Sequence, residues 1–203
     1  MKTTHLLAVL MVLLISGCSI STTQSSSEIG TTFFKPYTIA VSNILVAEKV
    51  MNAALFNEDY GWNDLFYYND NASSNYYQAR DYLSTSSDQV SEAKSLLNKA
   101  LLKLNTISSL APDEFYRQDI NLRTNLTNIL ISQYTVKANM VELRYDVLYS
   151  WWNDNATVFN ATWDAYVDEY NNNLLLQYNS YLEDSNTVRE DIDLLWDQNW
   201  YNI

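Results

Sequence analysis

Histidine, cysteine, glycine and proline are almost missing from this sequence of 203 residues. It contains one histidine, one cysteine, three glycines and two prolines. With a single cysteine no disulfide can form within the chain, so the fold has to be held together by burial alone. The scarcity of Gly and Pro argues against a β-sandwich or barrel, because those folds need turns with Gly or Pro at short spacing. We therefore expect long helices and few turns.

The first 17 residues are typical of an export signal that is removed. Lys2 supplies a positive charge, and residues 6–15 form an apolar run without any charged side chain. A run of ten residues is too short to span a bilayer, which takes roughly 20 residues, but it fits the apolar region of a signal peptide, about 7 to 15 residues long. We expect the mature chain to begin directly after this segment.

The residues at the expected cleavage site carry a resemblance to a known class. Ile15, Ser16, Gly17 and Cys18 form a branched apolar residue, two small residues and a cysteine. This pattern resembles the lipobox of prokaryotic membrane lipoproteins, over residues 1–18 only. The resemblance implies that the thiol of Cys18 carries a diacylglycerol and anchors the mature chain to a membrane on its extracytoplasmic side, at the cell surface or the periplasmic face. The alternative is an ordinary secretory leader whose cysteine stands there by accident.

Basic residues are few, which bears on the partners of the protein. The chain has 12 Lys and Arg against 24 Asp and Glu, a net charge of −12. Removing residues 1–17 takes away Lys2 and leaves 11 − 24 = −13. Nucleic acid is therefore not expected as a partner, because phosphate binding needs a basic patch. The same charge disfavours lying flat on anionic lipid and suits a soluble extracytoplasmic surface.

Composition divides the mature chain into a tether and one domain. Nine of the 14 residues from 19 to 32 are Ser or Thr, so we interpret residues 18–35 as the lipidated cysteine and a flexible tether. Residues 36–203 are long enough for a single helical bundle domain.

Four segments of that domain show apolar residues at alternating steps of three and four, as in packed helices. The segments cover residues 40–54, 83–107, 115–147 and about 155–195, with Gln133 breaking the third seam and residues 171–173 the weakest helical stretch of the fourth. Pro112 followed by two acidic residues is a good helix start for the third segment. We expect a loop over residues 57–74, which makes the first helix shorter than the others.

This pattern predicts an all-α fold, an elongated antiparallel up-down bundle of about four helices with coiled-coil-like heptad packing. Short links near Ala111 and Asn153 make the second, third and fourth helices antiparallel neighbours, each about 60 Å long at 1.5 Å per residue. A dimer of helical hairpins would show the same heptads. The oligomeric state therefore stays open.

The up-down topology brings two aromatic regions, which flank the first and third connections, to the same end of the bundle. The candidate binding residues are Trp62, Phe66, Tyr67, Tyr68, Tyr149, Trp151, Trp152 and Trp163. They either plug the end where helices splay or form a surface that recognises an extracytoplasmic protein or glycan, away from the membrane. A smaller group at the opposite end, Trp196, Trp200 and Tyr201, is expected to dock on the core.

The residues for most catalytic chemistry are missing. His5 is lost with the leader and Cys18 is the lipid site, so no imidazole or free thiol remains for a triad or a zinc site. Paired acids such as Asp168 and Glu169 are adjacent on a helix and do not face each other. Residues 69–71 are rich in oxygen but lack the glycine and final glutamate of an EF-hand loop. We expect no enzyme activity and assign no catalytic residue, metal or cofactor.

Two functions remain. One is a lipid-anchored binding or scaffold module with an aromatic tip, and the alternative is a receptor or sensor-type domain for a small extracytoplasmic ligand bound between the helices. A pocket of that kind would use Gln133, Arg117, Arg123 or Arg144, although Gln133 is equally a register-setting core residue and the arginines are expected to be solvated. A cavity near Gln133 would favour the receptor, and a tight seam there would favour the scaffold.

Overall fold

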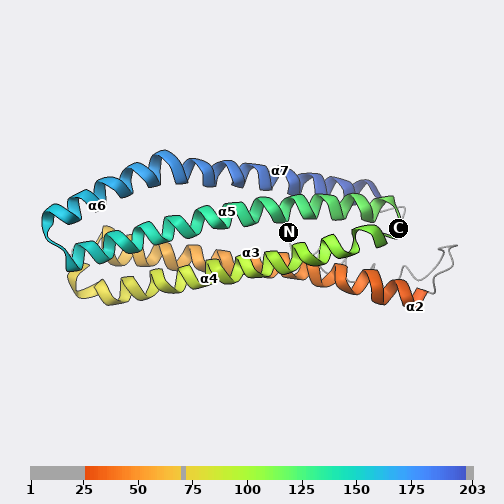
Figure 1. Ribbon diagram of the computed structural model, residues 1–203, viewed down its shortest axis with the longest axis horizontal. Helices are drawn as coiled ribbons and strands as arrows, with labels where there is room; N and C mark the ends of the chain where they lie inside the picture. Colours follow the sequence, from red (N-terminus) through yellow and green to blue (C-terminus); the bar gives the residue numbers. More distant parts are fainter. Residues whose placement is uncertain (1–25, 70–71, 200–203) are drawn as a thin grey trace.

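The computed structural model of the chain describes residues 26–69 and 72–199, and within these ranges every regular element is helical and no strand occurs. The predicted all-α class is therefore confirmed. The elements are, in chain order, α2 (Ser26–Ile29), η1 (Gly30–Phe34), α3 (Lys35–Asp59), η2 (Tyr60–Tyr67), α4 (Ala72–Ile107), η3 (Ser108–Leu110), α5 (Glu114–Asn153), α6 (Ala156–Glu169), η4 (Tyr170–Leu174) and α7 (Leu175–Asn199). They form four long helical runs that pack against one another as an elongated up-down bundle (Figure 1).

Side-chain caps fix where the last two runs begin. The carboxylate of Asp113 accepts a hydrogen bond from the backbone N–H of Tyr116 at 2.9 Å, which caps α5 at the predicted place. The amide oxygen of Asn155 accepts from the N–H groups of Thr157 and Val158 at 3.0 and 3.1 Å and caps α6. The short links before these caps turn the chain back on itself, as predicted.

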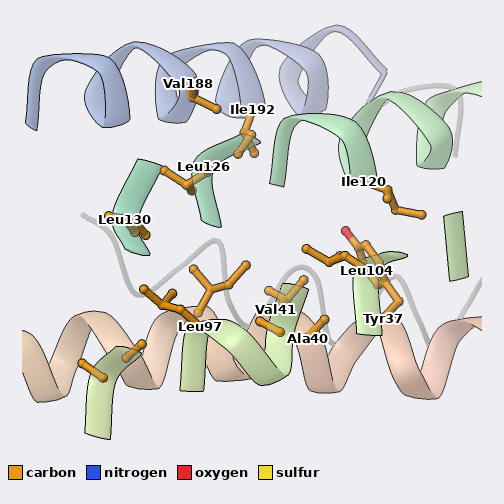
Figure 2. Close-up of a cluster of buried hydrophobic side chains, with 14 of the residues drawn as sticks. Tyr37, Ala40, Val41, Leu97, Leu104, Ile120, Leu126, Leu130, Val188 and Ile192 are labelled. Carbon is orange, nitrogen blue, oxygen red and sulfur yellow. The ribbon is translucent and has the colours of Figure 1, made fainter. Parts of the chain in front are cut away.

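The heptad positions form the core of the bundle. Every seam residue predicted for α3 and α4 is buried, and α5 adds Ile120, Leu126 and Leu130 to the same cluster. Figure 2 shows these side chains meeting Val188 and Ile192 of α7 in the middle of the bundle. On α6, which lies in the fourth predicted segment, Tyr166 is buried, whereas its neighbour Val167 is 38 % exposed.

The first helical run begins earlier than predicted. Residues 26–35, assigned to the flexible tether, are helical, so that part of the prediction is wrong; residues 18–25, with Cys18, lie outside the described residues. Phe33 is buried, stacks on Tyr37 at a centroid distance of 5.7 Å and meets Tyr116 edge-on. In the wide turn η1 the N–H of Lys35 donates to the carbonyl of Gly30. This turn precedes Pro36, which has no N–H to donate to the helical hydrogen bonds, and it makes room for the proline ring.

The first run also extends further than predicted, which contradicts the loop over residues 57–74. The helix continues through η2 to Tyr67, so the first run is comparable in length to the other three. Gly61 makes this possible, because a Cβ at that position would lie 2.8 Å from Cβ of Tyr82 and 3.1 Å from the carbonyl oxygen of Ala79. This glycine, which lies within the predicted loop, is instead the point where η2 approaches α4 closely.

This first run is also the one described helix with the length and composition to cross a membrane. Its most apolar window, within Gly30–Tyr67, has a mean hydropathy of 1.4. The run packs along α4 with the core positions of its seam buried. Because a core helix of a bundle meets the same criterion, hydropathy alone does not assign a membrane span here.

The fourth run changes direction at the stretch predicted to be weak. Residues 171–173 lie in η4, a π-helical turn between α6 and α7, and the run bends there (Figure 1). Both the α3–α4 connection and the α5–α6 turn lie at the end of the bundle beside α6. The aromatic regions that flank them are therefore brought together.

Candidate functional site: the aromatic end

Ring contacts between the first and second halves of the chain build the aromatic end. Trp62 stacks on Trp163 at 6.4 Å with an interplanar angle of 11°, and Phe66 meets Trp151 edge-on at 5.2 Å. Trp152 stacks on Tyr76 of α4 at 4.4 Å. The prediction that the two aromatic regions share one end of the bundle is confirmed.

The eight predicted binding residues divide into an inner and an outer group. Trp62 and Phe66 are buried and Trp151 and Trp163 are half-buried, whereas the outer rings are exposed. The exposed fractions are 48 % for Tyr67, 75 % for Tyr68, 53 % for Tyr149 and 41 % for Trp152. The inner rings close the end of the bundle, and the outer rings present aromatic surface to solvent.

Ring contacts hold three of the four outer rings, Tyr67, Tyr68 and Trp152, in place. Tyr67 stacks on Trp163 at 5.8 Å and lies edge-on to Tyr68 at 4.6 Å. Trp152 is in contact with Tyr76 on one side and with Trp151 on the other. Rings fixed in this way lose little conformational freedom on binding, which is an advantage for a recognition surface.

The surroundings of the exposed rings are acidic and polar. Asp59 and Asp64 are exposed on the run that carries η2, and Asp154 follows α5. The side-chain amide of Asn63 donates to Asp59 at 2.5 Å, and that of Asn69 donates to the carbonyl of Asp64 at 2.8 Å. The end of the bundle thus combines aromatic faces with hydrogen-bonding groups of mostly negative sign.

A buried ion cluster lies beneath the inner rings. Glu58 of α3 is 1 % exposed, forms an ion pair with Lys137 of α5 and accepts from Nη1 of Arg144 at 2.9 Å. Nη2 of Arg144 donates to the hydroxyl of Tyr170 at 2.8 Å, and the guanidinium lies over the ring of Trp62 at 5.3 Å. The prediction that Arg144 is solvated is wrong, because the side chain is 12 % exposed and pairs with the buried carboxylate of Glu58.

Burial changes the proton affinities of this cluster. Burial lowers the pKa of Lys137, while the carboxylate of Glu58 opposes that change. Burial raises the pKa of Tyr170 to about 12. One carboxylate is thus shared by two cations, and the cluster ties α3, α5 and η4 together below the aromatic end.

A second buried carboxylate organises the opposite end of the bundle. Asp119 accepts from the hydroxyl of Tyr37 at 2.5 Å, from Nε of Arg123 at 2.7 Å and from Nε1 of Trp196 at 2.6 Å. The prediction of a solvated Arg123 is therefore wrong, whereas Arg117 is exposed as predicted. Docking of Trp196 on the core is confirmed, and Trp200 and Tyr201 lie outside the described residues.

Sequence reasoning missed both buried acids, although the heptads contain a signal for them. Glu58 continues the α3 seam one step of four beyond Ala54, and Asp119 lies between the seam positions Phe115 and Leu122. Charged residues at seam positions call for buried partners. Lys137 and Arg123 are those partners.

Gln133 is the residue expected at the centre of a ligand site between the helices. Gln133 is buried, and it lines neither the groove between α5 and α6 nor the groove along α7. Within residues 26–69 and 72–199 no three His, Cys, Asp or Glu side chains gather as metal ligands. Asp70 and Asn71 of the oxygen-rich stretch lie outside the described residues.

Related proteins do not add to this geometry. Comparison with protein-family models, with curated proteins and with solved structures finds no match to the chain. The functional argument therefore depends on the arrangement of its own side chains.

Proposed function

We propose that the chain is a lipid-anchored extracytoplasmic protein that acts as a binding or scaffold module. In this proposal Cys18 carries the lipid, and the bundle holds its aromatic end away from the membrane, where it contacts a protein or glycan partner. No catalytic step is part of the proposal, in keeping with a mature chain that has no histidine or free thiol.

One observation carries the proposal. The exposed rings of Tyr67, Tyr68, Tyr149 and Trp152 lie at one end of the bundle, and two of them, Tyr67 and Trp152, stack on the buried rings of Trp62 and Tyr76. Exposed aromatic rings on a fixed base are typical of binding hot spots and of platforms on which sugars or apolar side chains stack. A structural plug alone would require only the buried rings.

The receptor alternative has less support. It requires a ligand site between the helices, and Gln133 was its central residue. The neighbours of Gln133 on the seam, Leu130 and Val136, are buried, and Gln133 lines neither of the surface grooves. A tight seam there favours the scaffold.

The test compares partner capture by the wild-type chain and a Tyr68→Ala, Tyr149→Ala variant in native cells, with crosslinking followed by purification. Both rings are more than half exposed, so the variant is expected to keep its helicity and melting temperature. Leu102→Ala is the matched control, because Leu102 is 69 % exposed near the opposite end of α4.

A partner captured by the wild type and by Leu102→Ala, but lost from the double variant, supports the proposal. Equal capture by all three chains, or no partner at all, contradicts it and leaves the rings as a plug. The lipid anchor is tested separately with Cys18→Ser, which should shift the protein from the membrane to the soluble fraction and abolish incorporation of labelled fatty acid.

A further inference from the structure

A concave surface lies between α5 and α6, and none of the exposed rings of the aromatic end is among its lining residues. It is lined by Leu143 and Asp146 of α5 and by Val158, Ala161, Ala165 and Tyr166 of α6, together with two threonines. We refer to it as the α5–α6 groove. Tyr166 forms part of its wall and packs inward on Trp62 at 5.2 Å, so the groove has a rigid base.

The groove exists because α6 points its large side chains elsewhere. Its aromatic residues pack toward the inner rings, whereas Ala161 and Ala165 on its other face are small and exposed. Val158, one turn before Ala161, is 45 % exposed. Residues 158, 161 and 165 follow the spacing of an apolar helical stripe, and all three are exposed.

The charge around this apolar stripe is of one sign. Glu142 and Asp146 lie one turn apart on α5, and burial together with Glu142 raises the pKa of Asp146. No Lys or Arg occurs in α6, and the nearest base on α5, Arg144, points inward to Glu58. The groove therefore has an apolar floor and a negative edge without a compensating cation among its lining residues.

We propose that the α5–α6 groove binds a basic amphipathic segment of a partner protein, with apolar side chains on the groove floor and Lys or Arg beside Glu142 and Asp146. Apolar side chains spaced along one face of a helix match a stripe of this kind, and opposite charge at the edge sets orientation and association rate. A second copy of this chain is a poor occupant, because each copy carries a net charge of −12. The groove gives the module a contact surface independent of the aromatic end.

The test is a direct titration of the full chain in non-ionic detergent micelles, with empty micelles as the baseline. The probe is a fluorescently labelled synthetic peptide of Leu and Lys, with the leucines on one helical face, and its counterpart has Glu in place of Lys. We expect the Lys peptide to bind and the Glu peptide to bind at least about tenfold more weakly. Rising salt should weaken binding of the Lys peptide.

Two variants locate the binding site. Ala161→Trp fills the groove from an exposed helix position and should weaken binding of the Lys peptide by about tenfold or more while the melting temperature stays unchanged. Glu142→Gln with Asp146→Asn removes two edge charges and should weaken it by about threefold to tenfold. Asp191→Asn with Asp193→Asn removes the same charge from exposed positions on α7 and should leave the affinity unchanged.

Three results would overturn the inference. The first is an affinity of Ala161→Trp equal to that of the wild type, or no binding of the Lys peptide at all. The second is an equal loss in the α7 control, which would mean that only the overall charge matters. The third is a loss of affinity in Tyr68→Ala, which would place the peptide on the aromatic end. An unchanged affinity in Tyr68→Ala separates this inference from the proposed function.

Discussion

Replacing Glu58 with Gln should destabilise the protein far more than the same change at a surface acid. Glu58 is 1 % exposed, and its two carboxylate oxygens pair with Lys137 and Arg144, whose side chains are 8 % and 12 % exposed. The amide of Gln carries no charge, so Glu58→Gln leaves two buried cations without a counter-ion. Breaking a buried pair in this way costs about 3–5 kcal/mol of unfolding free energy.

The matched control is Glu48→Gln on the same helix. Glu48 pairs with Arg189 at 2.6 Å, but these side chains are 28 % and 34 % exposed. Water screens a pair at the surface, so this variant should lose no more than about 1 kcal/mol. For a chain of this size about 2–4 °C of melting temperature corresponds to 1 kcal/mol, so Glu58→Gln should melt about 6–20 °C lower and Glu48→Gln less than about 4 °C lower.

The assay is urea unfolding followed by circular dichroism, with thermal melts as a second measure. A second variant, Lys137→Met in the Glu58→Gln background, removes one of the two stranded cations and should recover part of the lost stability. Equal midpoints for Glu58→Gln and Glu48→Gln would refute the reasoning, because a solvated carboxylate behaves in that way. A lack of recovery with Lys137→Met would show that packing, and not charge, sets the cost.

Other predictions follow from single contacts. Burial raises the pKa of Tyr116 and of Tyr170 to about 12, so both stay protonated in the folded protein, whereas an unfolded tyrosine ionises near pH 10. The free energy of unfolding should therefore fall between about pH 10 and 12, by up to about 1.4 kcal/mol per pH unit for each tyrosine. Urea unfolding at several pH values measures this fall. Gly61→Ala should cost about 1–3 kcal/mol because its Cβ meets α4. A Cβ at Gly30 has nothing within 4 Å, so Gly30→Ala should stabilise the protein by about 0.5–1 kcal/mol. Equal stabilities of Gly30→Ala and Gly61→Ala in calorimetry would contradict the close approach of Gly61 to α4. Asp113→Ala should lower the free energy of unfolding by about 1 kcal/mol, because the N-cap of α5 is lost. An unchanged melting temperature would show that this cap does not stabilise the protein.

Local periodicity made much of the fold predictable. The seam of α4, with Leu83, Val90, Leu97 and Leu104, repeats without interruption, and a stripe of this kind can be buried only against other helices. The start of α5 followed from Pro112 and its acidic neighbours. From these features the up-down order and the meeting of both aromatic regions at one end could be derived.

The sequence was less informative wherever a residue serves a distant partner. Gly61 reads as a turn signal in isolation, and its close approach to α4 becomes visible only in three dimensions. Glu58 and Asp119 were missed because their partners lie on other turns and other helices. Phe33 was missed for a similar reason, since its ring packs against Tyr116, more than 80 positions away along the chain. Which rings of the aromatic end are exposed also depends on the packing of α6, and no local pattern encodes that.

The three wide turns, η1, η2 and η4, have a consequence for how the length of this chain can change. A π-helical turn holds one residue more than an α-helical turn, so it shifts the rotational phase of everything beyond it by about 100°. Deleting one residue from η4 would allow a regular α-helix there and rotate Val188 and Ile192 away from the core. At η2 the same deletion would turn Trp62 and Phe66 relative to the seam of α3. Each wide turn is therefore a place where the helix already accommodates a one-residue insertion. Loss of one residue there would rotate the helix beyond it and turn its core face away from its partners, although no core side chain is replaced.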